Sequence, residues 1–143
     1  MRGHNPLNAP EALVLTMVLV AAADGAMTDR EIGVMAGQVQ TLPAFYEFTT
    51  DQLKDVTEAA VALLNDEDGL ARAANLMREA LSPRLRETAY ALACEVVAGD
   101  QGTKRRSLDM LDFVRTELGL DPLISSAIER GVRARHQRAE PGR

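Results

Sequence analysis

ALVLTMVLVAAADG, residues 12–25, is the stretch that decides the fold, because a degenerate copy follows about 76 residues later. The copy is TAYALACEVVAGDQ, residues 88–101. Each copy is an apolar run with helical periodicity that reaches a single aspartate and a loop containing glycine. A second amphipathic segment follows each copy. Two repeats of helix, acidic corner and helix predict an all-α fold.

The composition supports a bundle of helices rather than a sheet. Apolar residues make up 46% of the 143 residues, aromatic residues make up 3%, and tryptophan is absent. Alanine, leucine, valine and methionine therefore have to build the core, without the β-branched and aromatic enrichment of strands. A chain of this length suits one domain. We predict a single domain over residues 1–143, with flexible tails at residues 1–8 and 134–143.

Capping signals divide the chain into about seven long helices. Ser/Thr/Asn/Asp residues precede the apolar periods, and prolines stand at the first helical positions of several of them. Thr28 and Glu31 form the pattern of a capping box. The expected helices cover residues 9–23, 28–41, 51–65, 67–80, 83–98, 104–118 and 122–135, with a short turn at 43–48.

The same periodicity predicts which side chains face the core. Ile32 and Leu108 lie on the apolar stripes of their helices, and Phe45 with Tyr46 is expected to pack inward from the short turn. Cys94, the only cysteine, has apolar neighbours and reads as a small buried residue. A lone cysteine forms no disulfide within the chain, which favours a reducing compartment.

Charge is unevenly distributed along the chain. Residues 1–129 carry 11 basic and 20 acidic side chains, a net charge of −9, whereas residues 130–143 carry five basic and one acidic, +4. The acidic body disfavours nonspecific nucleic-acid binding, so we expect no nucleic-acid partner. The basic segment is either a solvated terminus, the simpler interpretation, or a contact for phosphate or anionic lipid.

The apolar run at residues 12–23 raises the question of membrane insertion. It is about a dozen residues long, whereas a membrane span needs about 20. A weak signal peptide is the alternative, since residues 21–23 are all alanine. The second copy of the helix lies in the middle of the chain, where no signal peptide can be. We therefore expect a soluble, cytoplasmic protein without a transmembrane segment.

The sequence carries no enzyme signature. His4 and His136 lie in the tails without other metal-ligand residues at the usual spacing. There is no Gly-x-Ser-x-Gly nucleophile motif and no phosphate-binding Gly-Lys-Ser/Thr sequence. The acidic loops lack the ligand spacing of an EF-hand. We predict a protein that is not an enzyme and has no catalytic residues and no bound cofactor.

The acidic corners allow two interpretations. Locally, Asp24 can accept hydrogen bonds from the free amides that begin the next helix, and Glu31 has a role in the capping box. Alternatively, Asp24, Glu31 and Asp100 converge and bind a divalent cation such as Ca²⁺ or Mg²⁺, which prefers carboxylate oxygens. The basic run at residues 104–106 beside Asp100 would repel a cation. Both interpretations remain open at this point.

These corners also carry a family resemblance. Residues 22–25, Ala-Ala-Asp-Gly, followed by Asp29-Arg-Glu31, resemble the motif of the TerB tellurite-resistance family. Residues 96–100 and 117–121 resemble the second half of that family, so the likeness spans about residues 11–124. The resemblance implies a cytoplasmic helical bundle of two similar halves. It also implies acidic positions suspected of binding metal, here Asp24, Glu31 and Asp100.

The resemblance shapes two functional hypotheses. The first is a TerB-like helical domain that binds a protein partner, either free or membrane-associated, in a response to tellurite, metal or envelope stress. The second is a sensor or binding protein for a divalent metal ion. It would use the acidic cluster at the corners of the internal repeat.

Overall fold

The computed structural model describes residues 6–98 and 105–139, and every regular element within them is helical. The chain is an all-α bundle with seven long helices in its described part, which confirms the predicted fold class. Their bounds lie within two residues of the expected ones at nearly every end. They are α1 (Ala9–Ala21), α2 (Asp29–Thr41), α3 (Thr50–Leu64), α4 (Gly69–Ala80), α5 (Pro83–Ala98), α6 (Arg105–Glu117) and α7 (Pro122–Arg135), with the 3-10 turn η1 (Pro43–Phe45).

Side-chain caps set the helix starts, as the sequence predicts. At α2, the Thr28 hydroxyl oxygen accepts a hydrogen bond from the Glu31 amide at 3.1 Å, and a Glu31 carboxylate oxygen accepts one from the Thr28 amide at 2.8 Å. The Asn8–Glu11 and Thr49–Gln52 pairs make the same reciprocal bonds at α1 and α3. Each cap satisfies amides that the first helical turn leaves unpaired.

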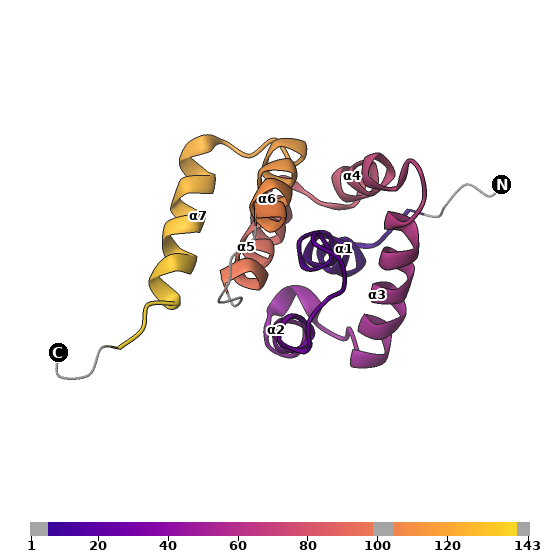
Figure 1. The fold of residues 1–143 in the computed structure, drawn as a ribbon, viewed down its shortest axis with the longest axis horizontal. Coiled ribbons are helices and arrows are strands. Elements are labelled where there is room, and N and C mark those ends of the chain that lie inside the picture. Colours follow the sequence, from indigo (N-terminus) through magenta and orange to yellow (C-terminus); the bar gives the residue numbers. More distant parts are fainter. Residues whose placement is uncertain (1–5, 99–104, 140–143) are drawn as a thin grey trace.

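Helix α1 lies at the centre of the bundle, with α2, α3, α4, α5 and α6 around it (Figure 1). All ten residues from position 12 to position 21 are buried. The one polar side chain among them, Thr16, donates its hydroxyl hydrogen to the Ala12 carbonyl oxygen at 2.8 Å. The central position explains why this helix is apolar on every side rather than amphipathic.

The two helices that carry the internal repeat pack against each other. α1 and α5 form the most extensive helix pair of the bundle, so the two copies of the sequence motif lie side by side in the core. That the two halves superpose as structural repeats remains a prediction.

Helix α7 lies at one end of the molecule (Figure 1), and its contacts are almost entirely with α5. No helix in the two described segments is long and apolar enough to cross a bilayer.

Four of the expected core positions are wrong. Phe45 is buried as predicted, but Tyr46 is 81% exposed, and Ile32 and Leu108 are 46% and 51% exposed. The apolar period of α4 also predicts that Leu70 faces inward, but Leu70 is 38% exposed. Tyr46 points outward because it follows the short turn η1 at a residue of extended backbone, and Glu47 after it adopts a left-handed conformation with φ of +64°. Ile32 and Leu108 lie on apolar stripes that no neighbouring helix fully covers.

Candidate functional site

The first acidic corner lies between α1 and α2. Asp24 is partly buried in the turn that joins the two helices. Glu31 is 5% exposed, and its carboxylate caps the first turn of α2. Glu31 therefore has the local structural role that its position in the capping box predicts.

The predicted three-carboxylate site stays a prediction. Asp100 lies outside the described residues, so its distance from Asp24 and Glu31 is not part of this structure. Within residues 6–98 and 105–139, no group of three or more histidine, cysteine, aspartate or glutamate side chains could hold a metal ion. The capping bond made by Glu31 takes up one of its carboxylate oxygens.

A groove lies between α6 and α7. Both helices pack on α5 but make almost no contact with each other, which leaves a gap above α5. The gap holds an open hollow of about 540 Å³, and a second hollow of about 340 Å³ continues it. The two hollows share four lining residues: Leu108, Leu111, Glu129 and Arg133. They therefore form one continuous groove.

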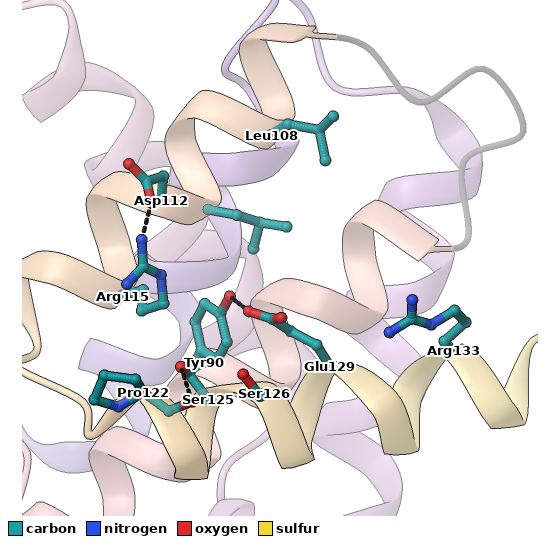
Figure 2. A pocket seen from close by; sticks show the side chains of 10 residues that line it. Tyr90, Leu108, Asp112, Arg115, Pro122, Ser125, Ser126, Glu129 and Arg133 are labelled. Carbon is teal, nitrogen blue, oxygen red and sulfur yellow. Dashed lines mark hydrogen bonds and ion pairs between the residues drawn. The ribbon is translucent and has the colours of Figure 1, made fainter.

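Tyr90 of α5 forms part of the floor of this groove. Its ring is almost fully buried, and its hydroxyl donates a hydrogen bond to a Glu129 carboxylate oxygen on α7 at 2.5 Å (Figure 2). Burial raises the pKa of Tyr90 well above its ordinary value, and the bond to Glu129 adds to this rise. The tyrosine therefore stays protonated and ties α7 to α5 across 39 residues of sequence.

Cys94 lies one turn after Tyr90 and lines the second hollow. It is buried, as predicted, with 6% of its surface exposed. Burial raises the pKa of the Cys94 thiol to about 12, and the charges of Glu129 and Glu95 also raise it, while the hydrogen bond with Tyr90 lowers it. A thiol that stays protonated at neutral pH is a poor nucleophile, so this cysteine contributes packing to the groove floor.

These two shifts predict that alkaline pH destabilises the fold. A thiol whose pKa is raised on folding stabilises the native state fully below its unfolded value of about 8.5, and this stability is lost as the pH rises toward 12. Tyr90 acts with the same sign above its unfolded value of about 10. Denaturant unfolding should show a free energy that falls between about pH 8 and pH 10.5, with a smaller fall in Cys94→Ala. An unchanged free energy over this range would contradict the prediction.

Charged side chains line the two walls of the groove. On α6, Arg115 forms an ion pair with Asp112, and this pairing raises the pKa of Arg115 (Figure 2). On α7, the side chain of Arg133 forms no ion pair or hydrogen bond with any other residue of the described chain. Leu108 lies on the α6 wall and is half exposed. The groove thus combines apolar side chains with a rim on which one cation is available to a ligand.

The sequence predicts none of this groove. Tyr90 and Glu129 lie on different helices, and only the packing of α6 and α7 on α5 brings the lining residues together. Two local signals could have drawn attention to these residues. Tyr90 is one of only five aromatic residues in the chain, and Leu108 lies on a helix rich in charge.

The described residues form a small all-helical domain with an open groove between its last two helices. The sequence model of the family described as tellurite resistance protein TerB matches residues 10–129, most of the chain. The chain therefore belongs to the TerB family, as its motifs predict. No curated protein and no solved structure matches it. The matched range ends at Glu129, within α7, so Arg133 lies outside it.

Proposed function

We propose that this TerB-family chain is a cytoplasmic protein-interaction domain without catalytic activity that acts in the response to tellurite, metal or envelope stress. The groove between α6 and α7 is the observation that carries the proposal. Ligand sites are concave and lined mostly by apolar side chains with a few polar groups, which is the composition of this groove. The partner would be a protein, either free or associated with the membrane.

An amphipathic helix is the occupant that suits this groove best. The groove runs between two helices, its floor and walls include Leu108, Leu111, Val97 and Val132, and its rim is charged. A partner helix would bury its apolar face against these side chains, which is a common mode of peptide recognition. Arg133 lies on the rim where a carboxylate on the partner helix could pair with it.

Site-specific photocrosslinking in the native host tests this proposal. A photoreactive residue at position 108 should give one discrete protein adduct, because Leu108 lies in the groove. The same residue at position 70 is the matched control, since Leu70 is also exposed but lies on α4. A Leu108→Glu variant that folds and accumulates normally should lower tellurite tolerance. Equal labelling at both positions, together with full tolerance in Leu108→Glu, would contradict the proposal.

Divalent-cation binding at Asp24, Glu31 and Asp100 is the competing proposal. Titration calorimetry with Ca²⁺, Mg²⁺, Mn²⁺ and Zn²⁺ separates it from the first. For an interaction domain we expect millimolar binding or none. Micromolar binding that is lost in Asp24→Asn would favour the metal-binding function instead.

A further inference from the structure

The outward side of α7 is a separate surface from the groove. The helix packs on α5 through Ser125 and Val132, which are 3% and 7% exposed. On the opposite side, Leu123 is 77% exposed at the start of the helix, and Arg130 lies seven residues further on along the same side. Ile124, 38% exposed, lies beside Leu123. An exposed aliphatic pair therefore precedes a cationic segment on the outermost helix of the bundle.

All formally charged side chains of the cationic segment, residues 130–138, carry a positive charge. Residues 130–138 contain four arginines and no acidic residue, whereas residues 1–129 have a net charge of −9. Arg135 is paired with Glu95 of α5 at 2.8 Å. Arg130, Arg133 and Arg138 form no ion pair with other residues of the described chain. Residues 130–138 thus form a segment of net positive charge in a chain that is otherwise net acidic.

We propose that the outward side of α7 binds the surface of an anionic lipid bilayer. Leu123 and Ile124 would enter the boundary between headgroups and acyl chains, and Arg130 and Arg138 would contact lipid phosphates. The acidic body would be repelled, so the protein would adsorb through this end alone. The inference does not depend on the groove, which opens on the α6 side of α7.

Lipid suits this surface better than nucleic acid does. A nucleic-acid backbone offers no partner for two exposed aliphatic side chains, whereas repulsion of the acidic body acts against both polyanions. A bilayer offers both phosphate and hydrocarbon on a flat surface. Because α7 lies at one end of the molecule (Figure 1), such a surface can meet it without contacting the other helices.

Vesicle flotation with the full chain tests the proposal. The protein should float with vesicles of phosphatidylglycerol and phosphatidylcholine at low salt, and remain unbound with pure phosphatidylcholine. The double substitution Arg130→Gln/Arg138→Gln should reduce partitioning about 25-fold, at about fivefold for each arginine near an anionic surface. Leu123→Ser should reduce it about tenfold, because the leucine no longer enters the boundary region.

A matched control separates a local surface from a simple effect of net charge. Arg30→Gln/Arg84→Gln removes two exposed cations from α2 and α5, and should leave partitioning nearly unchanged. Circular dichroism should show native helix content in every variant, since all the substituted side chains are exposed.

Several results would overturn the proposal. They are absence of flotation with anionic vesicles, equal losses in the two arginine pairs, and unchanged partitioning in Leu123→Ser. A final experiment measures binding to a short DNA duplex by fluorescence anisotropy. If the protein binds the duplex as tightly as it binds anionic vesicles, the arginines are assigned to nucleic acid instead. Loss of vesicle binding would leave crosslinking at position 108 unaffected, so the groove proposal is tested separately.

Discussion

Leu19→Ala is expected to lower the free energy of unfolding by about 3–5 kcal/mol, the upper range for a leucine truncated in a rigid core. Leu19 is fully buried in α1, and α1 is surrounded by other helices. Because neighbours on all sides are held by their own packing, the cavity left by the missing atoms cannot collapse easily. A small domain has only about 5–15 kcal/mol of total stability, so this loss is a large fraction of it. Denaturant unfolding followed by circular dichroism measures the change.

Leu123→Ala is the control for this substitution. The same atoms are removed from a side chain that is 77% exposed, so the expected change is within about 0.5 kcal/mol. Similar losses for the two variants would show that α1 is not the centre of the core.

Gly69→Ala is expected to lower the free energy of unfolding by about 3 kcal/mol, since overpacking a rigid contact has costs of this order. A Cβ atom at this position would lie 2.0 Å from the Leu63 carbonyl oxygen and 3.0 Å from the Leu64 Cα atom. Both atoms belong to the backbone at the end of α3, so no side-chain rotation relieves the clash. The turn between α3 and α4 would have to open. Thermal and denaturant unfolding both report the change.

Gly37→Ala is the control, and it is expected to raise the free energy of unfolding. Gly37 lies within α2, where an added Cβ would meet nothing within 4 Å. Alanine is favoured over glycine inside a helix, so this variant should gain about 0.5–1 kcal/mol. An unchanged free energy of unfolding in Gly69→Ala would mean that α4 lies farther from Leu63 than in this structure.

The helix boundaries could be predicted from the sequence because their signals are local. Thr28 and Glu31 lie within one helical turn, and their reciprocal bonds involve no residue from elsewhere in the chain. The same holds for Ser82, whose side chain accepts a bond from the Leu85 amide at 3.3 Å, and for Asp121, which accepts one from the Leu123 amide at 2.8 Å. Such contacts need no knowledge of tertiary structure.

Burial and the candidate site could not be predicted in the same way. The stripe that contains Leu108 is apolar, but whether it is covered depends on how far α7 lies from α6. The bond from Tyr90 to Glu129 joins residues 39 positions apart and depends on the packing of α7 on α5. Periodicity identifies the apolar face of a helix, whereas it does not say which neighbour covers that face or leaves it open.

The position of α1 has a consequence for synthesis of the chain. Its ten buried residues leave the ribosome before any of the helices that surround them. α5, its most extensive partner, begins at Pro83, more than sixty residues after the end of α1 at Ala21. Throughout that interval a nascent chain carries an apolar helix that α2, α3 and α4 can cover only in part. This segment is therefore where a chaperone or an aggregating neighbour would first engage the protein.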